Sequence, residues 1–550
     1  MKVREVVVDL MATVLADPTV VLIEDAYWLD EASDELLAEL SRMVGTLPWM
    51  VLALRRVDTV CFASSMDDAV VLHLGELKPE DTKALASAAI TAGLGSDMDE
   101  LDDLFDRGAT NPLFLIELVR AGASADTPDS IEALVTARID TLAARDRLLL
   151  REGAVLGAVI DRALLADVLD DPELARPDRW QPLSGFLHDE PDGTLRFQHA
   201  LYRDVAYDGL SFRRRQGLHR QVGETLEGQA GAAWAEASEL LSLHFHAARE
   251  WDRAWRYSVT AGERAQEKYA NKEAAAFYER AVSVPQSARP TDGLAELYEA
   301  YGDVLEINAD FDDAAGAFSR ARSATDEPES NVRLLRKEGV IRERRGQYTQ
   351  ALRWYGRGLS SLDDLPESAA LLRAEGEICL AYSGVRFRQG KLDETLRWAH
   401  RAEEIGRRID DKRIVAHSSY LLMIGYGVLR QPESAQYRDV ALPLFEELGD
   451  LLGQANVLNN LGVDAKESGD WAEALKLYHR SREARSLAGD VVGEATASLN
   501  IGEILSDQGH HDDAHELLDD ACRAFRRSQY PVGVAVATSY LARLPARRAR

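Results

Sequence analysis

The chain has 550 residues, of which 46% are hydrophobic and 29% are charged, so it is long enough for several globular domains. Its formal net charge is −29; a field of this sign repels phosphates and argues against a nucleic acid as partner. Three widely spaced cysteines form neither a disulfide framework nor a zinc motif, and no apolar run approaches the ~20 residues of a membrane span. We therefore expect a cytoplasmic protein without a membrane partner.

The N-terminal part alternates between helical and strand patterns. Residues 4–16 and 32–44 have the apolar spacing of helices, whereas residues 20–23, 49–54 and 70–74 are short, largely apolar runs (VVLI, WMVLAL and VVLHL). Buried strands that alternate with helices are typical of a parallel sheet covered on both faces. The pattern thus predicts the last part of an α/β domain.

The middle of the chain begins with a helical pattern over residues 79–121, in which Asn111-Pro112 precedes the helix LFLIELVRA. A small, polar linker follows at 122–130. Residues 131–228 combine short helices with GFLHDEPDGTLRFQH, in which Asp192-Gly193 is a tight-turn signal between two short strands. Helices followed by a two-stranded wing predict a winged-helix domain.

From about residue 235 onward there are no strand signals, and the sequence repeats itself. A shift of forty residues, from 449–481 to 489–521, superposes small and polar residues: Gly453 on Gly493, Ala455 on Ala495, Asn460 on Asn500, Gly462 on Gly502, Gly469 on Gly509 and Ala474 on Ala514. Helical hairpins of this kind cannot bury their faces alone, so they stack into a superhelix. The unit resembles a tetratricopeptide repeat in a long-helix form, and we expect Ala474 to fill the groove between neighbouring helices.

Four further segments resemble the signal-transduction ATPases with numerous domains (STAND). VVLIEDAYWLDEAS resembles their Walker B strand, which ends in two acids followed by an aromatic residue and an aspartate. VLALRR resembles their sensor-like strand, NPLFLIELVRA their lid motif, and RFQHALYRDVAY the end of their winged helix. The resemblance implies roles for the following residues: Glu24 and Asp25 at the catalytic position, Glu24 as a magnesium ligand, Trp28 and Asp30 in the Walker B motif, and Arg55, Pro112 and His199 as nucleotide contacts.

The sequence departs from this family in one respect: it contains no G-x-x-x-x-G-K-[ST], a loop that the resemblance places upstream of the Walker B strand. That loop and its lysine do most of the phosphate binding. We therefore expect Mg-ATP or ADP to bind only if such a loop exists upstream, and the enzyme class stays open. Arg55 could sense a γ-phosphate or neutralise Glu24 and Asp25. Pro112 could lie near the base or only start a helix, and His199 could contact a phosphate or pack at a domain seam.

The expected fold is mainly α: a partial P-loop NTPase remnant with its lid (1–121), a winged-helix-like domain (122–234) and a tetratricopeptide superhelix (235–550). The expected function is that of the regulatory sensor and interaction part of a STAND-type ATPase, which binds a peptide or protein on the concave face of the superhelix. The alternative is an ATP-binding signalling ATPase, linked to a nucleotide cyclase or a transcriptional regulator. The basic stretch 211–220 is expected to pair with acids of the adjacent domain, and His244 and His246 to face different ways on one helix.

Overall fold

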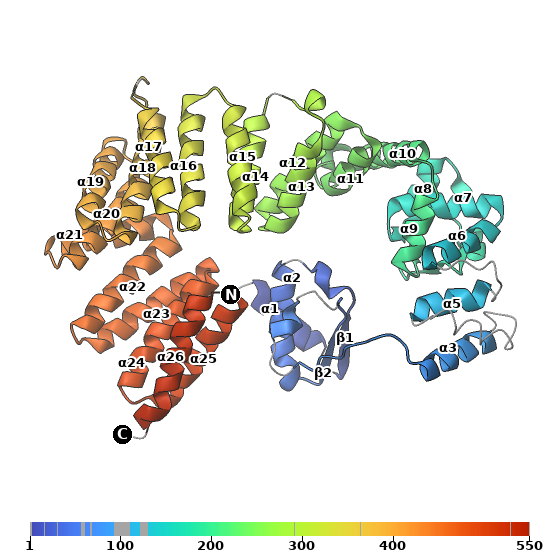
Figure 1. Ribbon diagram of the computed structural model, residues 1–550, viewed down its shortest axis with the longest axis horizontal. Helices are drawn as coiled ribbons and strands as arrows, with labels where there is room; N and C mark the ends of the chain where they lie inside the picture. The colour runs from blue at the N-terminus through green and yellow to red at the C-terminus, as the bar shows by residue number, and fades with distance from the viewer. Residues whose placement is uncertain are drawn as a thin grey trace. The chain divides into compact units, whose positions relative to one another are not determined.

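The computed structural model describes residues 3–15, 17–29, 31–56, 61–65, 69–92, 111–121, 130–290, 292–363, 365–528 and 530–548. The chain divides into two compact units, one made of Met1–Asp67 and Tyr298–Arg550 and the other of Asp68–Leu297. Almost all described elements are helices (Figure 1). No described helix is both long and apolar enough to cross a membrane.

The N-terminal segment forms a small α/β module. Its elements are α1 (Val3–Val14), β1 (Thr19–Ile23), η1 (Ala26–Trp28), α2 (Glu31–Arg42), η2 (Met43–Gly45), β2 (Trp49–Ala53) and η3 (Phe62–Ser65). The two strands pair in parallel, with Thr19 opposite Trp49 and Ile23 opposite Ala53. Trp49 is 6% exposed, packs with Val8 and Leu40, and donates a hydrogen bond from Nε1 to the Leu15 carbonyl oxygen at 2.6 Å. The two predicted helices and the first two predicted strands are confirmed.

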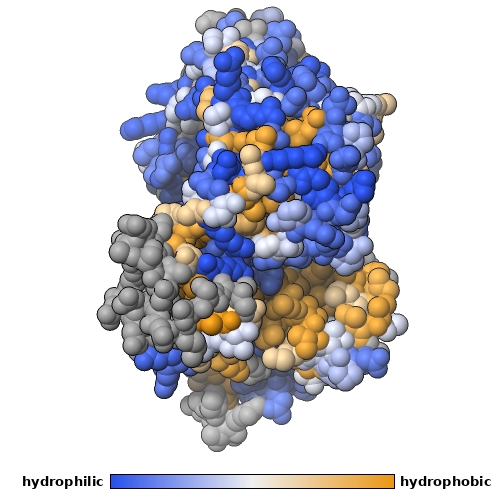
Figure 2. Space-filling view, turned by 90° about the vertical axis from the view of Figure 1, so that its right-hand side faces the viewer, coloured by the Kyte–Doolittle hydropathy of each residue, from blue (hydrophilic) through white to orange (hydrophobic). Residues whose placement is uncertain are grey.

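The third predicted strand, residues 70–74, is wrong. This segment forms no ladder, and the large apolar residues Val70, Val71, Leu72 and Leu74 are 55–86% exposed. An apolar run becomes a strand only where a free strand edge and a covering layer receive it, and the described residues supply neither to this run. One face of the β1–β2 sheet is also exposed, including Val20, Leu22, Met50 and Leu52. Figure 2 shows apolar residues, in orange, gathered on part of the surface.

The second unit begins with helices and a small sheet: α3 (Pro79–Thr91), α5 (Pro112–Ala121), α6 (Ile131–Thr141), α7 (Ala144–Gly153), η4 (Ala154–Leu156), β3 (Val159–Ile160), α8 (Arg162–Leu169), η5 (Pro172–Ala175), η6 (Pro177–Leu183), β4 (Leu187–Asp189), β5 (Leu195–Phe197), α9 (Ala200–Asp208) and α10 (Phe212–Ala230). The predicted wing is the β4–β5 hairpin. Its turn contains Gly193, with φ at +87°, and Asp192 Oδ1 accepts a hydrogen bond from the Thr194 amide at 3.0 Å. The sequence pattern does not reveal the third strand, β3, which pairs with β5 and has only two residues.

All described regular elements after residue 235 are helical, as predicted. They are α11 (Ser238–Ala248), α12 (Trp251–Glu267), α13 (Asn271–Ser283), η8 (Gln286–Ala288), α14 (Leu294–Ile307), α15 (Phe311–Ser323), α16 (Pro328–Arg344), α17 (Tyr348–Ser360), α18 (Ala369–Arg388), α19 (Leu392–Arg408), α20 (Lys412–Val428), α21 (Glu433–Leu448), α22 (Leu451–Glu467), α23 (Trp471–Ala488), α24 (Val491–Asp507), α25 (His511–Arg527) and α26 (Pro531–Arg548). Consecutive helices form hairpins that lie side by side from α16 to α26 (Figure 1).

The Gly-Asp pairs that recur every forty residues set the ends of these helices. Gly449 and Gly489 have φ at +66° and +75° and close α21 and α23, in a conformation that glycine adopts without steric cost. The aspartates that follow them cap the next helices. Asp450 Oδ1 accepts a hydrogen bond from the Gly453 amide at 2.8 Å, and Asp490 Oδ1 accepts one from Gly493 at 2.9 Å.

In several hairpins, a small residue of the first helix lies under a large residue of the second. A Cβ atom on Gly462 would come within 2.6 Å of the Tyr478 ring, so only glycine allows this approach. The same pairing, sixteen residues apart, joins Gly262 to Tyr278, Gly302 to Phe318 and Gly339 to Tyr355. Ala474 is fully buried and packs in one cluster with Tyr478, Ile501 and Ile504. Its predicted place between helices is confirmed.

Candidate functional site

Glu24 and Asp25 lie at the carboxyl end of β1, where the sequence places them, and both side chains are exposed. The backbone turns sharply there, because Asp25 has φ at +50°. Hydrogen bonds from the Leu54 amide to the Ile23 carbonyl and from the Ala26 amide to the Leu54 carbonyl, both 2.8 Å, hold the two strand ends together. Arg55 therefore follows β2 at the same edge of the sheet. Asp30 lies outside the described residues.

Within the described part of the chain, Arg55 forms no ion pair with Glu24 or Asp25. The neighbouring Arg56 instead packs on Tyr27 of η1, just after β1, with its guanidinium 5.0 Å from the centre of the Tyr27 ring. An ion pair between an exposed guanidinium and an exposed carboxylate contributes little free energy in water. A guanidinium stacked on an aromatic ring can therefore be as favourable as the ion pair.

The strand tip alone does not fit a magnesium nucleotide. Two carboxylates supply oxygen ligands, but the sequence has no glycine-rich loop with a lysine to hold the phosphates. Among the residues that the structure describes, no three His, Cys, Asp or Glu side chains are grouped so that they could hold a metal ion.

Pro112 stands at the first position of α5, where its missing N–H leaves no donor unsatisfied. Asn111 caps the same helix, with Oδ1 accepting hydrogen bonds from the amides of Leu113 at 3.0 Å and Phe114 at 3.2 Å. The Asn-Pro pair thus starts the helix. Thr110, which replaces the glycine of the lid motif, lies outside the described residues.

A buried carboxylate joins α5 to α6 and α9. Glu117 is 1% exposed, and its Oε1 accepts hydrogen bonds from Arg120 Nη1 at 2.6 Å, Arg138 Nη1 at 2.9 Å and the Tyr202 hydroxyl at 2.6 Å. Arg138 also donates from Nη2 to the Gly185 carbonyl oxygen at 2.7 Å. Burial, followed by the hydrogen bond to Glu117, raises the pKa of Tyr202. The sequence shows each of these residues but not that α5, α6 and α9 bring them together.

His199 directly precedes α9 and lies beside this cluster. Its ring meets Tyr202 edge-on, with ring centres 5.1 Å apart. Partial burial lowers the pKa of His199, and Glu117 opposes that shift. The imidazole is thus next to the contact between α5 and α9, while the rest of its surface is exposed.

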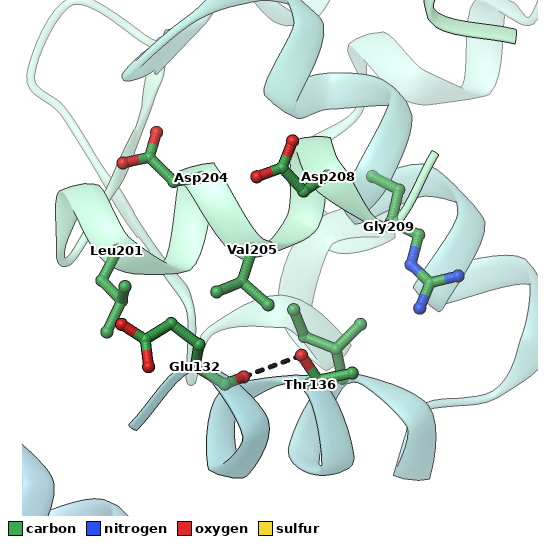
Figure 3. Close-up of a pocket in the computed structure, with 9 residues that line it drawn as sticks. Glu132, Thr136, Leu201, Asp204, Val205, Asp208 and Gly209 are labelled. Carbon is green, nitrogen blue, oxygen red and sulfur yellow. Dashed lines mark hydrogen bonds between the residues drawn. The ribbon is translucent and has the colours of Figure 1, made fainter. Parts of the chain in front are cut away.

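A groove of about 320 Å³ runs between α6 and α9 in the winged-helix region (Figure 3). Leu201, Asp204, Val205 and Asp208 line the groove from α9, and Leu201 and Val205 point toward α6. Thr136 Oγ1 donates to the Glu132 carbonyl oxygen at 2.7 Å. Asp204 pairs with Arg203 and Asp208 with Arg215, both at 2.8 Å. The groove is apolar on its inner side, and its aspartates are already paired.

The basic stretch 211–220 pairs mostly with acids of its own predicted domain, 122–234, rather than with those of the adjacent one; among the described residues, Arg220 Nη1, 4.0 Å from Glu250 Oε1, is its pair with the next predicted domain. Arg214 contacts Glu152 of α7, and Arg215 Nη1 lies 2.8 Å from Asp208 Oδ1. His244 and His246 have different partners, as predicted: His246 Nε2 lies 2.9 Å from Ser283 Oγ, whereas His244 faces α10.

The sequence does not reveal which side chain His244 contacts. Its Nδ1 lies 2.9 Å from Nδ1 of His219 in α10, and His219 Nε2 lies 2.9 Å from the Tyr207 hydroxyl of α9. The two imidazoles are 6% and 3% exposed, and burial lowers the pKa of each to about 4. Arg203 and Arg215 add to the shift at His219. A buried neutral pair thus connects the end of the winged helix to the first repeat helix.

Comparison with known proteins agrees with the helical repeats. The tetratricopeptide repeat family matches residues 453–527, which span α22–α25. An uncharacterized protein of Rhizobium meliloti (strain 1021) is 27% identical over 294 residues, covering 48% of this chain. The chain spans only 28% of the length of that relative.

Two solved structures align with this chain at low TM-scores. A STAND protein with a tetratricopeptide repeat sensor from Pyrococcus horikoshii is 13% identical, with a TM-score of 0.38, over 98% of this chain and 73% of its own. A Rap protein complexed with competence and sporulation factor is 14% identical, with a TM-score of 0.36, over 62% of this chain and 94% of its own. The family match at residues 453–527 and the paired helices of that region identify a tetratricopeptide-like helical array there.

Proposed function

We propose that this chain is the regulatory sensor part of a STAND-type signalling ATPase, and that its helical array binds a protein or a peptide. The observation that carries the proposal is the repeated interlock of a first-helix glycine under a second-helix ring, as in Gly462 and Tyr478. In such a hairpin, one face of the first helix packs against the second helix, and a ligand would bind on the opposite face. Stacked hairpins of this kind present an extended concave surface on which polypeptides bind.

Nucleotide hydrolysis by this chain alone would be weak or absent. Glu24 and Asp25 offer carboxylates at a strand edge without a phosphate cradle in the sequence. A ligand on the array would favour one of two conformational states of the ATPase. It can shift the equilibrium between these states only by as much as its affinities for them differ. His199, beside the Glu117 cluster, is the residue through which the winged helix would touch a nucleotide phosphate.

The proposal is tested by selection from a phage-displayed library of random twelve-residue peptides on the immobilised full chain. Enrichment of peptides that bind the purified chain again when synthesised is the expected result. A parallel selection on a Gly462→Trp variant, which disrupts the hairpin, should lose them. Failure to enrich any binder over several rounds would contradict the proposal.

The second candidate is an ATP-binding signalling ATPase, linked to a nucleotide cyclase or a transcriptional regulator, with its phosphate loop in an upstream segment. It is favoured by the exposed Glu24 and Asp25 at the carboxyl end of parallel strands, with Arg55 at the same edge. Titration of a fluorescent ATP analogue with Mg²⁺ discriminates between the two candidates. Micromolar binding that Glu24→Ala weakens would favour the ATPase.

A further inference from the structure

An arginine without a carboxylate partner lies at the contact between two second helices, α11 and α13. Gly223 of α10 packs under Phe245 of α11, and Gly262 of α12 packs under Tyr278 of α13, so α11 and α13 are the second helices of two successive hairpins. Arg280 of α13 is half-buried, and within the part of the chain that the structure describes it forms no ion pair. Burial lowers the pKa of its guanidinium.

Two contacts one helical turn apart join α11 to α13. Arg280 Nη1 donates to Ser242 Oγ at 2.5 Å, and His246 Nε2 lies 2.9 Å from Ser283 Oγ. Both contacts advance in the same direction along the two helices, so Arg280 and His246 lie on neighbouring turns of one surface. Burial and then the charge of Arg280 lower the pKa of His246, which places the guanidinium close enough to repel a protonated ring.

Both side chains keep hydrogen-bonding capacity that the described residues do not use. A guanidinium has five N–H donors, and Ser242 accepts from one nitrogen of Arg280. The Ser283 hydroxyl donates its hydrogen to the Arg280 carbonyl oxygen at 2.7 Å, so Nε2 of His246 is the donor in its contact with Ser283. Nδ1 of His246, which has no hydrogen-bond partner among the residues described, becomes a second donor when the ring is protonated.

Aromatic rings hold the two groups in place at the surface. The guanidinium carbon of Arg280 lies 5.4 Å from the centre of the Phe277 ring. The imidazole of His246 meets Trp251 of α12 edge-on, with ring centres 5.6 Å apart. Ser283 is exposed, whereas Arg280 and His246 are half-buried. The contact between the two helices thus reaches the surface, where a ligand can approach both groups.

The donors of this contact match a phosphate oxyanion. A partly buried cation without a counter-charge costs free energy, and an anion offsets that cost when it binds. The fork of a guanidinium matches two oxygens of a phosphate, and an imidazolium can donate to a third. A carboxylate has only two oxygens and cannot use all of these donors. The net charge of −29 repels anions at a distance, but salt screens that field within about 10 Å, so the local donors decide binding.

We propose that Arg280 and His246 form a binding site for a phosphate oxyanion, either free phosphate or the phosphate group of a monoester. Arg280 makes the two-oxygen contact, His246 supplies the third donor, and the buried Ser242 positions the guanidinium. The site lies on second helices, whereas a ligand on the concave surface meets first helices, so this inference does not depend on the proposed function. An anion held here bridges α11 and α13 and strengthens the contact between two successive hairpins.

Isothermal titration calorimetry on the full chain, with inorganic phosphate as the probe, tests the site. Saturable binding is expected. Arg280→Gln should weaken it by at least about tenfold, the effect of losing charge-assisted hydrogen bonds. Arg280→Lys, which keeps the charge without the fork, and His246→Gln, which removes one donor, should each weaken it less. The matched control is Lys272→Gln, an exposed cation of the same helix, and its affinity should be unchanged. Circular dichroism should show the same helix content in all variants.

Titrations with phosphoserine and with acetate distinguish the source and the chemistry of the anion. Binding of both phosphoserine and phosphate would assign the site to a monoester, whereas binding of phosphate alone would assign it to the free anion. Acetate, with two oxygens, should bind at least about tenfold more weakly. The inference is overturned if phosphate does not bind, if acetate binds as tightly, if Arg280→Gln leaves the affinity unchanged, or if Lys272→Gln weakens it equally.

Discussion

At the scale of single residues, this chain buries a few ionisable side chains, whose burial the hydrophobic pattern of the sequence does not predict. Glu117 and the pair His219–His244 are each less than 10% exposed. Each of them joins elements that are separate in sequence: Glu117 joins α5 to α6 and α9, and the histidines join α10 to α11. Because a buried polar group costs free energy unless it is paired, these contacts fix the relative placement of the helices that carry them.

Removal of the buried carboxylate should destabilise the second unit. Glu117→Ala leaves Arg120 and Arg138 without their shared acceptor, and breaking a buried pair in this way typically costs about 3–5 kcal/mol. Urea denaturation followed by circular dichroism measures the loss. Glu132→Ala, at an exposed position of α6, is the control and should change stability by less than about 0.5 kcal/mol. Equal behaviour of the two variants would show that Glu117 does not hold the helices together.

The histidine pair predicts a pH dependence of stability. The pKa of each imidazole is about 4 in the folded chain and about 6.5 when unfolded, so the unfolded chain binds more protons between these values. The stability is therefore fully present above pH 6.5 and is lost as the pH falls toward 4. The loss is at most about 3 kcal/mol for one group, from 1.36 kcal/mol per pKa unit.

His244→Gln removes one of the two groups and should flatten the dependence of the unfolding free energy on pH in this range. Denaturant titrations at several pH values, on wild type and variant, provide the comparison. Parallel curves for the two proteins would mean that the pair does not titrate as inferred.

At the scale of elements, helix packing decides what a glycine does. Gly462 and Gly316 both lie inside helices, but only Gly462 faces a neighbouring ring. Gly462→Ala should cost roughly 1–3 kcal/mol, because the new Cβ would lie 2.6 Å from the Tyr478 ring. Gly316→Ala meets no atom within 4 Å and should stabilise the chain by about 0.5–1 kcal/mol. Thermal unfolding of both variants checks the opposite signs, and a loss of similar size in both would contradict the interlock.

At the scale of the whole molecule, the helical array and the winged helix make up most of the chain, and the α/β module is small. We expect millimolar ATP with Mg²⁺ to leave the melting temperature unchanged. A ligand raises it only by binding the folded state, and the sequence has no phosphate loop to supply that affinity. Differential scanning fluorimetry with and without nucleotide tests this. A rise of several degrees that Glu24→Ala abolishes would instead support the ATPase.

The sequence by itself determined the local features of this protein. The forty-residue repeat, the Asp192-Gly193 turn and the two strands that precede Glu24 and Arg55 follow from spacing and turn chemistry, because these depend on residues close in the chain. The division into domains at 121 and 234 and the roles of Glu24, Asp25, Arg55, Pro112 and His199 stay predictions.

Only the tertiary structure decided which side chains meet across elements. The 70–74 run is as apolar as β1 but forms no strand, since a strand needs a partner edge that local sequence does not encode. In the same way, Arg56 rather than Arg55 contacts the Tyr27 ring that follows β1. Glu117 accepts hydrogen bonds from two arginines and a tyrosine, and the imidazole of His219 contacts that of His244. These contacts join residues up to 85 positions apart, and their energies depend on burial, which is a property of the folded whole.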